Sequence, residues 1–271
     1  MRYADLHVHT TQSDGTSTPA QLVKVAIACG LSALAIVDHD TVDGIPEALA
    51  EAKGSGLEII AGVELTTQYE NQEIHLLGYF LDYQDKVLLE KLKSIQQNRI
   101  ERVYKIIKNL EQFNLKLNPE TVFNISGKGT VGRMHIARAL VQDGLVGSNS
   151  EAFNKYIGDK SPAYVLGFRL SPQQGIQLIK DAGGVAVLAH PYILHNDALI
   201  EEFVSYGLAG IEVYYPEHSQ SMVNFYLDLA KKLNLLVTGG TDFHGNAKPE
   251  IKLGMIKIPF ALVEKLRQAK K

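Results

Sequence analysis

A group of titratable residues stands near the start of the chain, in the segment ADLHVHTTQSDG. Asp5, His7 and His9 alternate with apolar residues, and Asp14 follows in the next polar stretch. In a β-strand this alternation places the carboxylate and both imidazoles on one face. Such a face is unfavourable in a protein interior unless its polar groups gain partners. The segment therefore predicts a strand that binds a ligand.

More histidines and acidic residues stand at or near the ends of other strand-like segments. They are His39, Glu64, His75, His190, Asp242 and His244. Because the carboxyl ends of parallel strands meet on one face of a barrel, these side chains are expected to converge with His7, His9 and Asp14. This set exceeds what one tetrahedral zinc ion needs and suits two or three divalent ions. Imidazole and carboxylate ligands without thiolates favour Mn, Zn or Fe. Such a site predicts hydrolysis of a phosphate ester by metal-activated hydroxide.

The elements that would position these residues alternate between two hydrophobic patterns. Strands are predicted over residues 2–9, 33–39, 58–66, 73–80, 184–191, 210–215 and 235–244. Helical spacing of apolar residues occurs over 19–30, 45–56, 171–184, 197–207 and 222–234. This alternation is typical of βα units and a parallel sheet. A chain of 271 residues is long enough for one α/β barrel or for one with an insertion, and a two-domain arrangement remains open.

The alternation stops between about residues 84 and 165, where helical patterns replace strands. We expect a helical subdomain at 84–165, inserted into a barrel domain formed by 1–83 and 166–271. Its first helix, from about Lys86 to Phe113, carries Arg99 on the apolar stripe and Arg102 one turn further on. Two interpretations are open. The arginines are salt-bridged or snorkelling side chains on a solvated helix, or they are a pair that contacts phosphate.

A glycine-rich segment, ISGKGTVGRMHIARAL, follows within this helical region. Its match to G-x-G-x-x-G is weak, because a dinucleotide fingerprint needs a preceding central strand and the segment before it is polar. Arg133 and His135 fall in the first turn of the next predicted helix, where basic residues oppose the macrodipole. They are either an exposed pair of little energetic consequence or part of an anion-binding site.

The bulk composition is that of a soluble globular protein, with 45% hydrophobic and 21% charged residues. A net charge of −3 argues against a protein that coats nucleic acid, although a small anionic substrate remains compatible. Cys29 is the single cysteine, so no intramolecular disulfide can form, and it is expected to act as a buried small hydrophobe. No leader and no membrane-spanning stretch are evident, so we expect a cytoplasmic protein without membrane association.

Five motifs resemble those of the PHP (polymerase and histidinol phosphatase) family of metal-dependent phosphoesterases. DLHVHT, AIVDHDTVDG, GVELT, AHP and GGTDFHG occur in the family's order and span the chain from Asp5 to Gly245. The resemblance implies a distorted seven-stranded (β/α) barrel and a trinuclear metal site. It assigns the first ion to His7, His9, Glu64 and Asp242. It assigns the second ion to Asp14, His39 and His244, and the third to Glu64, His75 and His190, so that Glu64 bridges the first and third ions. Some members carry histidine where this chain has Asp14, which leaves the identity of the second ion open.

Within the family, three further segments resemble the subgroup that acts on nucleoside 3',5'-bisphosphates and on 5' ends of short RNA. They are NRIERV, GRMHIARAL and KSPAYV. The resemblance implies that Arg99, Arg102, Arg133 and His135 hold phosphates of a nucleotide or short oligonucleotide. No obligate protein partner is evident from the sequence. Histidinol phosphatase or another small-molecule phosphatase is the alternative. A noncatalytic metal-binding PHP module is an alternative of another class.

Three remaining polar residues are expected to play other parts. Asp5 shares the face of the histidines and is expected to orient an imidazole rather than to bind an ion. His195 and His218 lie in polar loop segments and are expected to be solvated surface residues.

Overall fold

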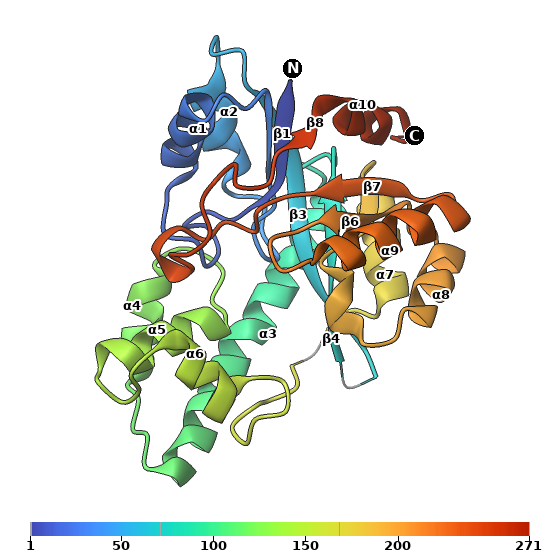
Figure 1. The fold of residues 1–271 in the computed structure, drawn as a ribbon. Coiled ribbons are helices and arrows are strands. Elements are labelled where there is room, and N and C mark those ends of the chain that lie inside the picture. The colour runs from blue at the N-terminus through green and yellow to red at the C-terminus, as the bar shows by residue number, and fades with distance from the viewer. Residues whose placement is uncertain (1, 71, 168, 271) are drawn as a thin grey trace.

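The computed structural model describes residues 2–70, 72–167 and 169–270, so the outermost residues of the expected barrel ranges, 1 and 271, lie outside it (Figure 1). In this part of the chain eight strands form one sheet in the order β7-β6-β5-β4-β3-β2-β1-β8. Their bounds are β1 (Tyr3–Val8), β2 (Ala33–Ile36), β3 (Glu58–Tyr69), β4 (Gln72–Tyr79), β5 (Val185–Leu188), β6 (Gly210–Tyr214), β7 (Leu236–Gly239) and β8 (Ile258–Pro259).

The two sides of the sheet approach each other at β1 and β7. Val8 forms a parallel bridge with Phe243, and the backbone N–H of His9 donates to the Phe243 carbonyl at 3.0 Å. A Cβ atom at Gly240 would lie 2.3 Å from the backbone nitrogen of His7, so only glycine allows the chain leaving β7 to pass this close to β1. The sheet is a nearly closed eight-stranded barrel, and the prediction of an α/β barrel is confirmed.

Strand direction differs from the predicted all-parallel sheet. Strands β1, β2 and β3 are parallel, as are β5, β6 and β7, but β4 runs antiparallel to both β3 and β5. Tyr69 of β3 pairs with Gln72 of β4, and a connection this short makes a hairpin because a parallel pair needs a crossover of a dozen or more residues. β8 was not predicted because it has only two residues, and it pairs antiparallel with β1.

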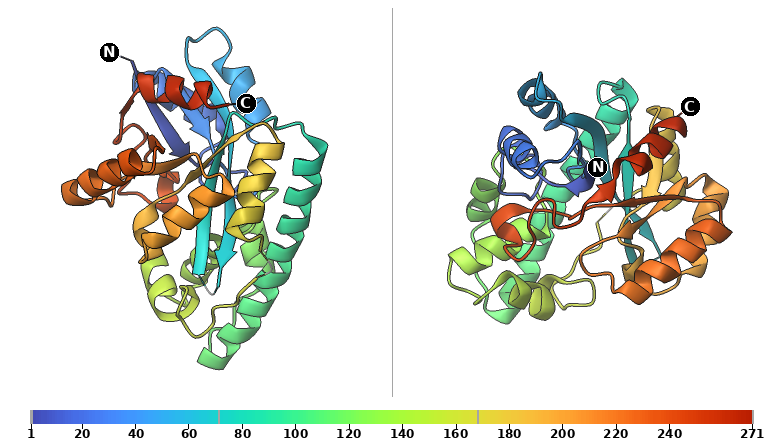
Figure 2. Two further views of the ribbon diagram at one scale, coloured as in Figure 1. Left: turned by 90° about the vertical axis from the view of Figure 1, so that its right-hand side faces the viewer. Right: turned by 45° about the horizontal axis from the view of Figure 1, so that its top comes forward.

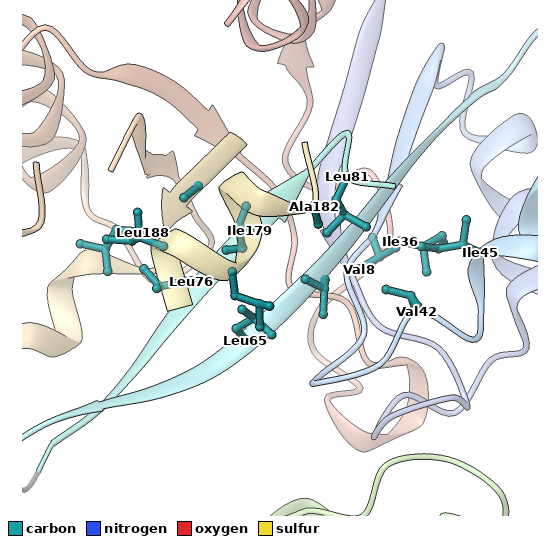
Figure 3. Packing of buried hydrophobic residues seen from close by; sticks show 14 of the residues in the cluster. Val8, Ile36, Val42, Ile45, Leu65, Leu76, Leu81, Ile179, Ala182 and Leu188 are labelled. Carbon is teal, nitrogen blue, oxygen red and sulfur yellow. The ribbon is translucent and has the colours of Figure 1, made fainter. Parts of the chain in front are cut away.

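Helices cover the outside of the sheet. They are α1 (Pro19–Ala28), α2 (Ile45–Ala52), α7 (Pro172–Asp181), α8 (Ala198–Tyr206), α9 (Gln220–Lys232) and α10 (Phe260–Gln268), with 3₁₀ segments at Pro191–Leu194 (η3) and Gly245–Ala247 (η4). Figure 3 shows Ile45 of α2 beside Ile36 of β2, and Ile179 of α7 near Leu65 and Leu76 of the hairpin. These apolar side chains are buried, so the helices hold the strands whose ends carry the polar residues.

The region between β4 and α7 is helical. It contains α3 (Lys86–Leu110), η1 (Glu111–Phe113), α4 (Pro119–Ser126), α5 (Arg133–Gln142), α6 (Asn149–Ala152) and a π-helical turn, η2 (Phe153–Ile157). The start of α3 joins the barrel's apolar cluster through Leu88 and Leu92, whereas Val103 and Leu110 join Ile136 and other residues in a separate cluster. In Figures 1 and 2, α3 runs along the β3–β4 hairpin into the group of helices at one end of the barrel.

Two details of the sequence are clarified by this arrangement. Gly127 follows α4, so the G-x-G-x-x-G segment is preceded by a helix rather than by a strand and lacks the context of a dinucleotide fingerprint. Cys29 is half-buried rather than buried, and its thiol donates to the Leu253 carbonyl.

In the described ranges no helix has the length and apolar character needed to cross a membrane.

Candidate active site

The predicted metal ligands meet around the carboxylate of Glu64, which lies in the middle of β3 rather than at its end. Its Oε2 lies 3.2 Å from Nε2 of His7 and 3.0 Å from Nε2 of His9. Its Oε1 lies 2.8 Å from Nδ1 of His75 and 3.2 Å from Nε2 of His190. His75 belongs to the first half of β4, and the antiparallel pairing sets it opposite Thr66 of β3, close to Glu64. One buried carboxylate thus contacts imidazoles from β1, β4 and the turn after β5.

The other four predicted ligands extend this cluster on one side. Oδ1 of Asp242 lies 3.1 Å from Nε2 of His9. Oδ1 of Asp14 lies 3.2 Å from Nε2 of His244, and Oδ2 of Asp14 lies 4.0 Å from Nε2 of His39. The rings of His9 and His244 stack with their centroids 4.2 Å apart. All nine predicted ligands therefore lie in one continuous cluster.

Three subsets bring one ligand-type atom from each residue to within 4.8 Å of one another. They are His7, His9, Glu64 and Asp242; His9, Asp14, His39 and His244; and His39, Glu64 and His75. The first equals the set expected for one ion, and the second adds His9 to the set expected for another. The third has His39 where His190 was expected, although His190 also contacts Glu64. The geometry therefore offers three neighbouring positions for cations.

The donor atoms of this cluster fit divalent ions. Both ring nitrogens of His9, Nδ1 of His39, Nδ1 of His190 and Oδ1 of Asp14 are buried and form no hydrogen bond within the described part of the chain. Burial alone would lower the pKa of His9, but the carboxylates of Asp242 and Glu64 outweigh it and raise that pKa to about 9. These atoms are close to opposite charges yet poorly directed for hydrogen bonding, a situation that shared cations resolve.

The loop after β1 is fixed so that Asp14 faces the cluster. The buried carboxylate of Asp38 accepts hydrogen bonds from the backbone N–H of Thr10 (2.7 Å), its hydroxyl (2.7 Å) and the hydroxyl of Ser13 (2.5 Å). Two ligands that follow strands have left-handed backbone conformations, with φ of +27° at His190 and +52° at Asp242. Such conformations are uncommon for residues other than glycine, although Asp and His adopt them more often than most, and they occur often at functional sites.

Asp5 does not take the expected place beside an imidazole. Its carboxylate accepts hydrogen bonds from the backbone N–H (2.9 Å) and hydroxyl (2.7 Å) of Thr241, and from the N–H of Gly254 (3.2 Å). Burial raises the pKa of Asp5 to about 6, although these hydrogen bonds oppose the shift. Asp5 instead ties β1 to the segment after β7, next to Asp242.

Glu212 has the position that was expected for Asp5. It lies on β6, where its Oε1 accepts from Nδ1 of His7 at 2.9 Å and its Oε2 accepts from the backbone N–H of His190 at 2.9 Å. A carboxylate in this position fixes the ring orientation of a metal-binding histidine and raises its basicity. The sequence signal was a single glutamate inside the apolar strand segment GIEVYY.

Two further side chains that the sequence did not reveal hold Asp242. Nζ of Lys248 lies 2.6 Å from Oδ2 of Asp242, and the hydroxyl of Tyr215 donates to the same oxygen at 2.9 Å. Both contacts are to Oδ2, so Oδ1 is left to face the histidines. The orientation of this ligand is therefore determined by the protein.

A cavity of about 280 Å³ opens above the cluster, and guanidinium groups form its opposite wall. Oε2 of Glu73, on β4, lies 2.8 Å from Nη2 of Arg169, 3.3 Å from Nη2 of Arg133 and 3.5 Å from Nη2 of Arg102. Its Oε1 lies 3.1 Å from Nε2 of His75. Burial alone would raise the pKa of Glu73, but the charges of Arg133 and Arg169 hold it well below its usual value. The sequence had not indicated Glu73 or Arg169.

Arg99 and His135, two of the predicted phosphate contacts, have strong internal partners. Arg99 donates from Nε to Asp40 (2.6 Å) and from Nη2 to the hydroxyl of Thr66 (2.6 Å), which matches the salt-bridged interpretation, although it also borders the cavity. Nδ1 of His135 accepts from the backbone N–H of Gly132 at 3.0 Å. His135 is buried and does not line this cavity, whereas Arg102 and Arg133 do.

The two histidines outside the cluster differ from each other. His195 is exposed, as expected. The expectation for His218 is wrong, because its ring is buried beside Tyr192 and Tyr215 and its Nδ1 donates to the Val213 carbonyl at 2.8 Å. The polar residues around it in the sequence hid the fact that the loop folds back against the end of β6.

Comparison with known proteins agrees with this geometry. The family model of the PHP domain matches residues 5–156. The chain is 35% identical over 245 residues to a 5'-3' exoribonuclease of Haemophilus influenzae, with 89% of each protein covered. It is 32% identical over 259 residues to a 3',5'-nucleoside bisphosphate phosphatase of Chromobacterium violaceum, with 90% of this chain and 88% of the relative covered.

Solved structures with the same fold include a candidate metal-dependent phosphoesterase from Bifidobacterium adolescentis. It has a TM-score of 0.90 and 32% identity, and covers 97% of this chain and 94% of its own. An amidohydrolase from Chromobacterium violaceum, determined with bound sulfate and no metal, has a TM-score of 0.86 and 31% identity, with 94% of this chain and 91% of its own covered.

Proposed function

Because the chain belongs to the PHP domain family, we propose that it is a metal-dependent phosphoesterase that hydrolyses nucleoside 3',5'-bisphosphates and removes nucleotides from the 5' ends of short RNA. The observation that carries this proposal is the cluster of nine ligand-type side chains around Glu64, which faces a cavity walled by arginines. A carboxylate and imidazole site opposite guanidinium groups suits a substrate with two phosphates.

Two or three divalent ions would be held by the nine clustered residues, and this donor set suits Mn, Zn or Fe. When bound, such ions polarise a phosphate and lower the pKa of water. The chain's own residues prepare the site. Glu212 fixes the ring of His7, and Lys248 with Tyr215 fixes Asp242, so that the ligand atoms need little rearrangement.

The second phosphate of the substrate would be held by the arginines around Glu73. Three guanidinium groups share the carboxylate of Glu73, and only Arg133 has a second carboxylate partner, Asp159, so positive charge is in excess here. Nη2 of Arg102 and Nε of Arg169 are buried and form no hydrogen bond within the described ranges, so they are available to an anion. Arg102 and Arg133 come from residues 84–165, and we propose that this helical subdomain supplies the specificity of the barrel's metal centre.

The test is a substrate panel on protein whose metal content has been measured. We expect hydrolysis of adenosine 3',5'-bisphosphate at one position and removal of nucleotides from 5'-phosphorylated oligoribonucleotides, with much slower hydrolysis of histidinol phosphate. Arg133→Met should raise KM for the bisphosphate by about tenfold or more, the order expected for a charge-assisted contact, and leave KM for p-nitrophenyl phosphate unchanged. Preference for histidinol phosphate, or no hydrolysis by metal-loaded protein, would overturn the proposal.

A further inference from the structure

A second cavity, of about 320 Å³, lies on the other side of the loop that carries Asp14. The segment 11–16 forms one of its walls, and the end of α4 with the following glycine-rich turn forms another. Its lining residues are Thr11, Gln12, Ser13, Gly15, Thr16, Ile125, Ser126, Gly127, Lys128 and Arg138. The lining contains two cations, several hydroxyl groups and no acidic residue, in a chain whose net charge is −3.

The two cations of this cavity form no close ion pair within the described ranges, although the carboxylate of Asp14 attracts Arg138 from beyond ion-pair distance. Neither Lys128 nor Arg138 forms an ion pair or a side-chain hydrogen bond with any residue in the described ranges. Arg133, on the same helix, differs in this respect because it pairs with Glu73 and Asp159. Cations without a close ion-pair partner, at the lining of one cavity, are free to bind an anion.

The walls of the second cavity are held rigidly. The backbone N–H of Thr130 donates to the Gln12 carbonyl at 2.8 Å. A Cβ atom at Gly129 would lie 2.5 Å from the Thr11 carbonyl oxygen, so the glycine permits this close contact between the turn and the loop. The ring of His135 accepts a hydrogen bond from the backbone N–H of Gly132 at 3.0 Å. The cavity is therefore preformed rather than assembled by its ligand.

Helix α5 contributes an arginine to each of the two cavities. Arg133 in its first turn lines the metal-bearing cavity, and Arg138, five residues later, lines the second cavity. Five residues advance about 7.5 Å along a helix axis and turn the side chain to a different face. An RNA strand with its 5' end at the metal cluster would thus meet a second cationic position further along its backbone.

We propose that the second cavity binds a backbone phosphate of a single-stranded oligoribonucleotide, downstream of the nucleotide held at the metal cluster. This inference rests on the proposed function, because it extends the path of the same substrate. Backbone phosphates are the ligand that fits, since the site combines cations with hydroxyl groups and offers no aromatic surface for a base. A nucleoside bisphosphate with one phosphate at the metal cluster and the other at the arginines around Glu73 has no phosphate left for the second cavity.

The experiment compares wild type with the double variant Lys128→Gln/Arg138→Gln, and Lys265→Gln on α10 is the control for loss of a cation outside both cavities. For a 5'-phosphorylated oligoribonucleotide, we expect the double variant to lose about tenfold or more in kcat/KM. The slope of log kcat/KM against log salt should fall in magnitude by about 0.7, the value for one phosphate contact on a single strand. Turnover of adenosine 3',5'-bisphosphate should not change.

A binding measurement separates failure of this inference from failure of the proposed function. Metal-loaded protein is titrated into a fluorescent 5'-phosphorylated oligoribonucleotide whose phosphorothioate linkages resist hydrolysis, and anisotropy gives Kd. Weaker binding by the double variant, with the control like wild type, supports the inference even if turnover is absent. Equal binding by all three proteins, or an equal loss of bisphosphate and oligonucleotide turnover in the double variant, would overturn it.

Discussion

Replacement of His135 by glutamine should remove part of the acid sensitivity of folding. The imidazole is buried, and its Nδ1 accepts a hydrogen bond from Gly132, so the folded protein keeps it neutral. Burial lowers the pKa of His135 to about 4, despite the opposing charge of Asp14, from an ordinary value of 6.5. Between these values the unfolded chain binds a proton that the folded chain does not, so stability falls as the pH drops from 6.5 toward 4.

The size of the effect follows from the two pKa values. At about pH 7.5 His135 is neutral in both states, whereas at about pH 5 it is mostly protonated in the unfolded chain only. With about 1.4 kcal/mol for each pKa unit, this residue should cost the wild type about 2 kcal/mol of unfolding free energy over that interval. Glutamine at the third position of α5 can accept from Gly132 as in a capping box, but it does not titrate.

The assay is urea unfolding followed by far-ultraviolet circular dichroism at the two pH values, on wild type and His135→Gln. His195→Gln is the matched control, because it makes the same replacement at an exposed histidine. The result is the difference between variant and wild type in the change of unfolding free energy from one pH to the other, since most other titrating groups are common to all three proteins. If His135→Gln loses as much stability as wild type between these pH values, the claim that the folded protein holds His135 neutral is refuted.

Three further outcomes are expected. Arg99→Met should lower the free energy of unfolding by about 3–5 kcal/mol, because it leaves the carboxylate of Asp40 buried without its ion-pair partner. In the double variant, Asp40→Asn should restore part of this loss. A loss below about 1 kcal/mol in a denaturant titration of Arg99→Met would contradict a stabilising ion pair. Glu212→Gln should weaken metal binding by about 10–100-fold in competition with a chelator, because Glu212 supports His7; unchanged affinity would remove that role. Chelator treatment of the wild type should abolish hydrolysis, and added Mn, Zn or Fe should restore it; activity that survives verified metal removal would rule out metal dependence.

The local spacing of residues accounts for what could be predicted from the sequence. Alternation along β1 placed His7 and His9 on one face, and positions at strand ends brought His39, His190 and His244 to the same region. These rules act over a few residues and follow from strand geometry alone. The barrel and the location of the ligand cluster could therefore be predicted from the sequence.

Contacts between distant segments account for what was missed. Glu73 looked like an ordinary polar residue of β4, and only the packing of α3, α5 and the segment before α7 surrounds it with arginines. Lys248 reaches Asp242 from a loop, and Glu212 reaches His7 across the barrel. The reversed direction of β4 depended on a tight connection that hydrophobic periodicity does not register.

The central claim is that Glu64 holds together a multinuclear metal site that hydrolyses phosphate esters. Its most direct test is the metal content of Glu64→Gln, measured by elemental analysis after gel filtration, beside hydrolysis of adenosine 3',5'-bisphosphate and a circular dichroism spectrum. We expect a folded protein that has lost at least one bound ion per chain and nearly all turnover, because the Oε atoms of Glu64 contact His7, His9, His75 and His190. A folded variant with the metal content and turnover of wild type would contradict the claim.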